Sequence, residues 1–403
     1  MSDNEAYIYD WVRTPRGRGK SDGALHPLKP IELLKQLLIA LQQRTQVDTK
    51  LIDDVILGCV TAVGDQGANI ARSALLFAGW QQGTAGFTLN RFCASGLETC
   101  NIAAAKIMSG FEQAIVAGGV ESMSRHPICE DGGSWYIDPE VNRELLFVPQ
   151  GISADIIATL ENFSRHELDS YACDSHHRAQ HATVEGYFKR SLVPCYDRNG
   201  ELLLDKDETV RATCSIATMS NLKPSFAAMS NLGFISHVQT RYPQLDQIQH
   251  LHHAGNSSGI VDGAALMLIG SRKFGEASGL KPRARIISMA SVGSEPVIML
   301  TGNAAASRKA LANINLQPQD IDLYEVNEAF AAVALQYLRT MAIDTEQTNV
   351  NGGAIALGHP LGATGTMVLG TLLDELERRE LARGLATFCA GAGMATTTII
   401  ERV

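Results

Sequence analysis

One cysteine lies where a short strand-like run meets a long helical segment. Residues 87–89 (Phe-Thr-Leu) have strand character, residues 96–108 are predicted to form a helix, and Cys93 stands between them. The start of a helix presents free N–H groups and the positive end of the helix dipole, and both stabilise a thiolate. Cys93 is therefore a candidate nucleophile. The alternative is a buried structural cysteine, which is the more common state of a free cysteine.

Two more reactive side chains stand beside glycine-rich segments. His359 belongs to G-H-P-L-G at 358–362, just before a helix predicted over 363–379, and Cys389 ends a strand-like run and precedes A-G-A-G at 390–393. Glycine lets the backbone approach a ligand closely, and a histidine in such a loop can act as a general base. A histidine that only caps the helix and a core cysteine beside a turn are the alternatives.

Two polar segments complete the set of candidates. The segment N-E-A-F at 327–330 lies at another strand-to-helix junction, and the loop G-N-S-S-G occupies 255–259. The alternative for Glu328 is an acidic residue in the first helical turn, where it complements the helix dipole. Polar glycine loops are in most proteins only turns.

In chain order, Cys93, G-N-S-S-G, N-E-A-F, G-H-P-L-G and C-A-G-A-G resemble the motif set of the thiolase family. The ordered set is much more specific than any of its members. The segments R-T-P at 13–15 and G-G-V-E-S-M-S at 118–124 match the family as well, so the resemblance covers essentially the whole chain. It implies an enzyme that is acylated on Cys93 by an acyl-CoA, with His359 activating the thiol and Cys389 moving a proton.

The chemistry of such an enzyme explains why it needs two cysteines. Cleavage of a 3-oxoacyl-CoA breaks a carbon–carbon bond, so a nucleophile must attack the ketone while an acid protonates the departing acetyl carbon. Two oxyanions arise, and preorganised donors stabilise each by about 3 kcal/mol. The resemblance implies that the N–H groups of Cys93 and Gly391 bind the first oxyanion, and that His359 and a water held by Asn327 bind the second.

The resemblance also implies where the coenzyme is held. Ser258 corresponds to a serine that meets the pantetheine arm, and Arg211, the last residue of D-E-T-V-R at 207–211, corresponds to an arginine that reaches the adenosine phosphates. The residues after Arg211 depart from the family pattern, and a solvated loop arginine is the alternative. CoA and acyl-CoA are then substrates, and no permanently bound cofactor is expected.

A second departure concerns the acyl group. Many thiolases that act on acetoacetyl-CoA have a methionine, often after a histidine, where this chain has Pro149 and Gln150 before G-I-S-A-D at 151–155. The stretch 231–253 is also longer than in compact short-chain thiolases. Both features are similar to a subgroup that acts on bulky acyl-CoAs, including steroid side chains, and they predict a reshaped acyl pocket.

The alternation of short β-rich runs with longer helical segments predicts an α/β fold. A helix end, a strand and a glycine turn follow one another at 106–124 and again at 381–398, which hints at an internal duplication. The resemblance implies a thiolase-like fold of two duplicated α/β halves in a layered sandwich with an inserted loop domain. We predict the first half over 1–120 plus 251–274, an insertion with CoA-binding and oligomer contacts over 121–250, and the second half over 275–403. An ordinary third domain is the alternative for the insertion.

The composition excludes several other classes of protein. The chain of 403 residues is 45% hydrophobic and has a net charge of −9, so it is not mainly disordered and has no bulk charge for nucleic acid. No apolar run reaches 18 residues, residues 1–5 are polar and acidic, and the eight cysteines include no C-x-x-C pair. These features predict a cytoplasmic protein without a membrane partner or a disulfide framework. His177 and His181 have metal-ligand spacing, but without a third ligand a solvated helix face is favoured and no metal is expected.

Three other functions are alternatives to thiolysis. A biosynthetic acetoacetyl-CoA thiolase that condenses two acetyl-CoA molecules uses the same residues, so the direction stays open. A non-catalytic acyl-CoA-binding homologue is disfavoured because Cys93, His359 and Cys389 are all present. A decarboxylating condensing enzyme of the ketoacyl-synthase type lacks a second catalytic cysteine. The family resemblance further implies a homodimer or homotetramer.

Overall fold

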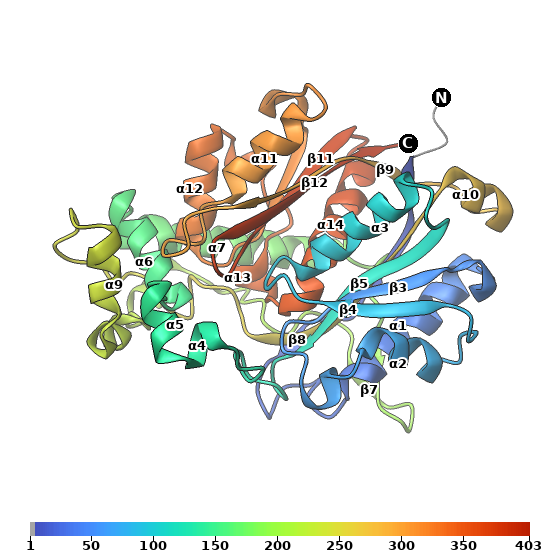
Figure 1. Ribbon diagram of the computed structural model, residues 1–403, viewed down its shortest axis with the longest axis horizontal. Coiled ribbons are helices and arrows are strands. Elements are labelled where there is room, and N and C mark those ends of the chain that lie inside the picture. The colour runs from blue at the N-terminus through green and yellow to red at the C-terminus, as the bar shows by residue number, and fades with distance from the viewer. Residues whose placement is uncertain (1–4) are drawn as a thin grey trace.

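The computed structural model describes residues 5–403, in which ten strands form one mixed sheet that folds around two central helices (Figure 1). The first half of the chain supplies β1 (Ala6–Arg13), β2 (Gly17–Arg18), α1 (Pro30–Thr45), β3 (Asp54–Gly58), α2 (Ile70–Phe77), β4 (Ala85–Leu89), α3 (Ser95–Met108), β5 (Ala114–Ser122) and β8 (Val261–Gly270). The second half supplies α10 (Arg272–Ser278), β9 (Ala284–Gly293), α11 (Asn303–Ala312), β10 (Leu323–Val326), α12 (Ala331–Met341), α13 (Ala354–Leu357), α14 (Leu361–Arg378), β11 (Arg383–Ala390) and β12 (Met394–Arg402).

The two halves of the sheet have the same topology. Strand order is β4-β3-β5-β8-β1 in the first half and β10-β11-β12-β9 in the second, and β1 pairs with β9 to join them. The pairs β3–β5 and β10–β11 are parallel, whereas β5–β8 and β11–β12 are antiparallel. A parallel bridge between Tyr324 and Thr348 stands in the second half where β4 stands in the first. The prediction of two duplicated α/β halves is confirmed.

The helices form three layers around the two halves of the sheet. Helices α1 and α2 cover the outer face of the first half, α11 and α12 cover the outer face of the second, and α3 and α14 lie between them (Figure 1). One buried cluster joins α3 and α14 to strands of both halves. The sequence predicted helices over 96–108 and 363–379, and α3 and α14 begin one and two residues earlier.

Glycines allow the central helix α14 to touch the first half of the sheet through its backbone. A Cβ atom added to Gly119 in β5 would lie 1.9 Å from the carbonyl oxygen of Gly362 in α14. A Cβ atom added to Gly365 would lie 2.0 Å from the backbone nitrogen of Leu97 in α3. No other residue fits at these contacts, because only glycine lacks the Cβ atom.

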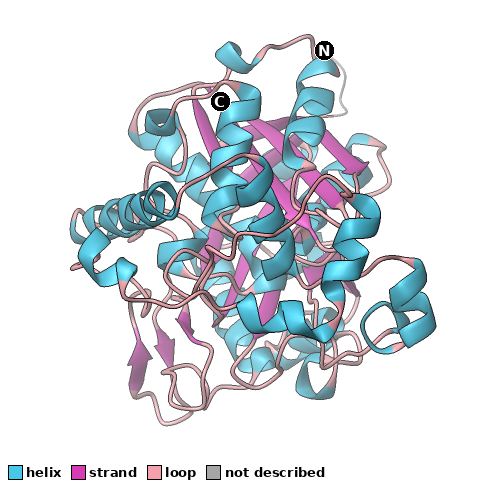
Figure 2. Ribbon diagram, turned by 90° about the vertical axis from the view of Figure 1, so that its left-hand side faces the viewer, coloured by secondary structure: helices cyan, strands magenta, loops and turns pink. Residues whose placement is uncertain are grey.

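The region between β5 and β8 combines helices with a short hairpin and long loops. Much of it lies on the left-hand side of Figure 1, and Figure 2 views the molecule from that side, with helices and loops in front of the strands. This region contains α4 (Ser134–Ile137), α5 (Pro139–Glu144), α6 (Gln150–Leu160), α7 (Arg165–Val184), the hairpin β6 (Cys195–Tyr196) and β7 (Leu202–Leu204), α8 (Ile216–Ser220) and α9 (Phe234–Arg241). Helix α6 contacts α12, and α7 contacts both α12 and α13. The exact domain boundaries stay a prediction.

The two histidines with metal-ligand spacing have other neighbours. His177 Nε2 lies 2.9 Å from the carbonyl oxygen of Cys214, and the His181 ring packs edge-on against Tyr187. Among residues 5–403, no helix is both long and apolar enough to cross a membrane.

Replacing Gly119 by alanine is expected to destabilise the protein, because the new Cβ atom collides with the Gly362 carbonyl oxygen. Overpacking typically costs about 1–3 kcal/mol, and a clash between two main chains belongs at or above the upper end. Urea denaturation measures the free energy of unfolding. Gly293→Ala is the control, because no atom of the described chain lies within 4 Å of a Cβ atom there. Equal stability of the two variants would contradict the proposed close approach.

Candidate active site

Cys93 lies in a tight turn between β4 and α3, as the sequence predicted. Phe92 has a positive φ of 47°, and the Ser95 hydroxyl closes the turn by donating to the Phe92 carbonyl oxygen at 2.6 Å. The backbone N–H of Arg91 in turn donates to the Ser95 hydroxyl at 2.8 Å. Helix α3 begins two residues after Cys93, and the cysteine is only 5% exposed.

Burial dominates the electrostatics of this thiol. It raises the pKa of Cys93 to about 11, although the Gln150 side chain and the cysteine's own backbone N–H favour the thiolate. The nearby Glu121 carboxylate raises the pKa further. Cys93 is therefore protonated at neutral pH in the free protein, and a base must remove its proton before it can attack.

His359 has the properties of such a base. Its Nδ1 lies 2.6 Å from the Thr364 hydroxyl, which itself donates to the Pro360 carbonyl oxygen at 2.9 Å. Because the hydroxyl proton is used, the Thr364 oxygen must accept from Nδ1–H, and this leaves Nε2 with a free lone pair. Nε2 is buried and has no hydrogen-bond partner among the described residues. Burial and the Arg16 charge lower the pKa of His359 to about 3, so the ring is neutral.

Cys389 lies at the carboxyl end of β11, where the sequence placed it, and is fully buried. Burial raises its pKa far above the usual range, and a thiolate on Cys93 would raise it further, so the two cysteines lie near each other. The turn after β11 touches the turn before α3, because a Cβ atom added to Gly391 would lie 3.3 Å from the Phe92 ring. The His359 ring lies 6.5 Å from the Phe388 ring, measured between centroids. The fold thus gathers Cys93, His359, Cys389 and Gly391.

Asn327 carries an amide that suits a bound water. Its backbone N–H donates to the Thr387 carbonyl oxygen at 3.1 Å, and its side chain is 1% exposed. Neither Nδ2 nor Oδ1 has a partner among the described residues. An unsatisfied buried amide costs about 1–3 kcal/mol, and a water with polar partners removes that cost.

Ser258 is joined to this cluster through its loop, and Arg211 is not. The Ser258 N–H donates to the Ala329 carbonyl oxygen at 3.0 Å, and the next carbonyl, of Gly259, accepts from the His359 N–H at 2.8 Å. Arg211 has an exposed side chain, and its backbone N–H donates to His176 Nδ1 at 3.1 Å.

The interpretation of Glu328 as a first-turn acid is wrong. Helix α12 begins only at Ala331, after Phe330 in an extended conformation. The Glu328 carboxylate is buried and accepts hydrogen bonds from Ser175 Oγ at 2.7 Å and from the Ile355 N–H at 3.1 Å. Glu328 therefore ties α7 and α13 to the strand end that carries Asn327.

Gln150 is a site residue whose contact the sequence did not reveal. Pro149 and Gln150 indicated only a reshaped pocket, but Gln150 is the first residue of α6 and its amide lies beside the Cys93 thiol. The local sequence signal was this departure from the family pattern. It could not show which distant side chain the amide would meet.

An aromatic cluster adjoins the same turn. The Trp135 ring lies 5.5 Å from Phe92 and 5.0 Å from Phe147 between ring centroids. Trp135 also lies 3.4 Å from a Cβ atom added to Gly391, and Phe147 lies 6.0 Å from Phe234. The inserted region therefore places an apolar, aromatic wall next to Cys93.

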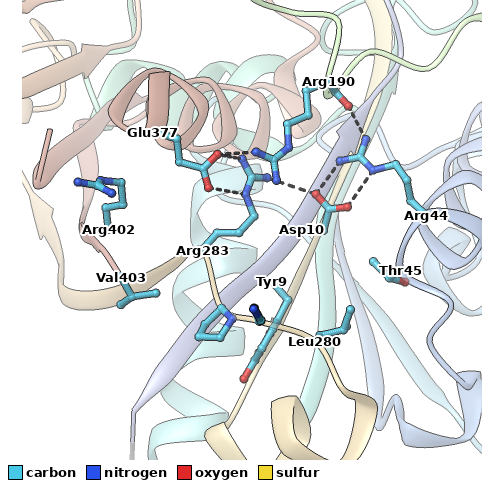
Figure 3. Close-up of a pocket in the computed structure, with 12 residues that line it drawn as sticks. Tyr9, Asp10, Arg44, Thr45, Arg190, Leu280, Arg283, Glu377, Arg402 and Val403 are labelled. Atoms are coloured by element: carbon cyan, nitrogen blue, oxygen red, sulfur yellow. Dashed lines mark hydrogen bonds and ion pairs between the residues drawn. The ribbon is translucent and has the colours of Figure 1, made fainter. Parts of the chain in front are cut away.

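A separate cavity of about 320 Å³ lies at the other end of α14 (Figure 3). Ion pairs occupy it: Arg283 binds both Asp10 and Glu377, and Arg44 and Arg190 bind Asp10 and Glu377 respectively. The 18 residues of α14 separate this cavity from His359 by roughly 25 Å. It takes no part in the cysteine–histidine cluster.

Replacing Gln150 by leucine is expected to raise the pKa of Cys93, because the amide that favours the thiolate is lost. One such hydrogen bond corresponds to an about threefold to tenfold lower thiolate fraction. Iodoacetamide alkylation of the Cys93 peptide, followed by mass spectrometry from pH 7 to 10, measures this fraction. Gln43→Leu, on the exposed face of α1, is the control. An alkylation profile of Gln150→Leu that matches native protein would refute the contact.

Comparison with known proteins gives one consistent result. Two family models match the chain, described as "Thiolase, N-terminal domain" over residues 6–234 and "Thiolase, C-terminal domain" over residues 280–402. A 3-ketoacyl-CoA thiolase of Serratia proteamaculans is 39% identical and aligns over 98% of this chain and 99% of its own length. A 3-ketoacyl-CoA thiolase of Klebsiella pneumoniae is 37% identical and aligns over 99% of this chain and 100% of its own length. The solved structure of the Bacillus anthracis acetyl-CoA acetyltransferase matches 99% of both chains with a TM-score of 0.86 at 33% identity.

Proposed function

This chain belongs to the thiolase family, and from that membership we propose that it cleaves 3-oxoacyl-CoA with CoA to give acetyl-CoA and a shortened acyl-CoA. It is an acyltransferase, as its relatives are. The observation that carries the proposal is the buried neutral His359, with a free Nε2, in the same cluster as two buried thiols.

The first half of the reaction transfers the acyl group to Cys93. His359 Nε2 takes the thiol proton, and the sulfur attacks the 3-keto carbon of the substrate. The N–H groups of Cys93 and Gly391 bind the oxyanion of this adduct. The bond between C2 and C3 then breaks, protonated His359 and the water on Asn327 bind the enolate oxygen, and the Cys389 thiol protonates C2. Acetyl-CoA leaves, and Cys389 is a thiolate.

The second half returns every group to its starting state. The thiol of an incoming CoA gives its proton to the Cys389 thiolate and attacks the acyl group on Cys93. The Cys93 sulfur leaves as a thiolate and recovers its proton from His359. No permanently bound cofactor is needed, since only protons and the acyl group move. Ser258 holds the pantetheine arm, and the exposed Arg211 binds the adenosine phosphates.

The acyl group is proposed to be bulky. Gln150 beside Cys93 and the wall of Trp135, Phe147 and Phe234 support this, because aromatic faces suit large apolar ring systems.

A reducing, cytoplasmic location is also proposed. None of the eight cysteines is in a disulfide, although the sulfur atoms of Cys173 and Cys214 lie 2.7 Å apart.

The enzyme is expected to release acetyl-CoA from 3-oxoacyl-CoAs in the presence of CoA, with ring-bearing chains preferred over the four-carbon substrate. Mass spectrometry of the products measures this. Cys93→Ala should abolish release, and His359→Asn should lower it about 10²- to 10⁴-fold because the general base is lost. Cys100→Ala, which changes another buried cysteine on α3, is the matched control and should remain active. No release from any substrate would overturn the function, and release from acetoacetyl-CoA alone would overturn only the bulky acyl group.

A symmetric dimer or tetramer is proposed as the working form. Strand β4 is one of the two edge strands of the sheet, pairs only with β3 among the described strands, and is partly exposed along its length. An edge strand presents unpaired backbone N–H and C=O groups, which another element or another chain normally covers. Light scattering is expected to give two or four times the chain mass of 43.4 kDa. A mass of one chain at micromolar concentration would exclude the oligomer.

A further inference from the structure

Asn303 carries a buried amide that no step of the proposed reaction uses. It is the first residue of α11 and is 1% exposed. Neither Nδ2 nor Oδ1 has a hydrogen-bond partner among the described residues. Leaving such an amide unpaired is unfavourable, and a native protein that keeps one has a reason for it.

Two contacts place this amide beside the second cysteine. Gly302, which precedes Asn303, lies against β12, since a Cβ atom added to it would be 2.9 Å from the Ala395 Cβ atom. Ala395 is the direct partner of Cys389 in the β11–β12 ladder. The start of α11 therefore covers Cys389, and the Asn303 amide lies close enough to the sulfur to favour the thiolate.

We propose that Asn303 is a positioning residue that donates an Nδ2–H hydrogen bond to the Cys389 thiolate and so holds the second cysteine ready to exchange protons. The inference rests on the proposed function for the part that Cys389 plays in the reaction. Between loss of its proton to C2 and recovery of a proton from CoA, the sulfur is an anion in a fully buried place. Burial and the neighbouring Cys93 disfavour that anion, and a neutral N–H donor offsets both without adding a charge.

Two variants of Asn303 and one control variant test this hydrogen bond. Asn303→Leu keeps the size of the side chain and removes the donor, whereas Asn303→Asp keeps the shape and puts a negative charge beside the sulfur. Asn313→Leu is the matched control, because Asn313 follows the last residue of the same helix and its exposed amide donates to the Met289 carbonyl oxygen at 3.3 Å.

The first measurement is alkylation of Cys389 by iodoacetamide between pH 6 and 10, followed on the Cys389 peptide by mass spectrometry. Because burial raises the pKa of Cys389 far above its usual range, the alkylation rate over this whole interval is proportional to the thiolate fraction. Asn303→Leu is expected to raise the pKa by about one unit, so that alkylation is about tenfold slower than in native protein at every pH. Asn303→Asp should be slower still, and Asn313→Leu should match native protein. A folded Asn303→Leu or Asn303→Asp variant that is alkylated at the native rate would overturn the proposal.

The second measurement is loss of deuterium from the methyl group of labelled acetyl-CoA, which requires proton abstraction by Cys389. Asn303→Leu is expected to slow this exchange about tenfold while acylation of Cys93 by acetyl-CoA stays within about twofold of native. Equal losses in both steps would indicate a general packing defect and overturn the positioning role. If native protein cleaves no 3-oxoacyl-CoA but Asn303→Leu still slows alkylation of Cys389, the Asn303–Cys389 contact stands and the proposed function fails.

Discussion

The site depends on the direct contact between the backbone of α14 and the first half of the sheet. Gly362 lies against Gly119 in β5 and against the end of β3, with no side chain between the two main chains. His359 stands three residues before Gly362, and the turn that carries Cys93 leads into α3, which packs on α14. Because the glycines fix the distance between these backbones, they also fix the histidine of one half relative to the cysteine of the other.

A buried carboxylate locks the same contact. Glu121 at the end of β5 accepts hydrogen bonds from the N–H groups of Val60, Thr61 and Gly362, at 2.9, 3.0 and 2.9 Å. Burial raises the pKa of this carboxyl while the three N–H groups oppose that rise. A buried charge without partners would be very unfavourable, so loosening α14 would leave Glu121 without one of its donors. The start of α14 is thus fixed both by the close backbone contact at Gly362 and by the hydrogen bond from the Gly362 N–H to the Glu121 carboxylate.

The sequence predicted the parts of the site that local patterns encode. Cys93 at a strand-to-helix junction, the helices around it and the two α/β halves all follow from runs of a few residues and from the order of motifs. The Glu328 interpretation failed because an extended Phe330 delays α12, and its partners Ser175 and Ile355 come from α7 and α13. For the same reason, the only local signal at Gln150 was its departure from the family pattern, and Asn303 had none. Each of these two residues matters because its amide lies near the sulfur of a cysteine that is far away in the sequence. The chain brings the amide and the sulfur together only when it folds.

The reacting groups share one electrostatic condition, which is that none carries a charge at rest. Burial keeps Cys93 protonated with a pKa of about 11, keeps His359 neutral with a pKa of about 3, and raises the pKa of Cys389 as well. Charge therefore appears only as the reaction proceeds, in surroundings where water does not screen it and a fixed dipole acts strongly. The nearby charges of Glu121 and Arg16 reinforce the neutral states of Cys93 and His359, whereas an amide favours an anion without adding a charge. Three amides serve the groups that become charged: Gln150 at the first thiol, Asn303 as proposed at the second, and Asn327 for the enolate water.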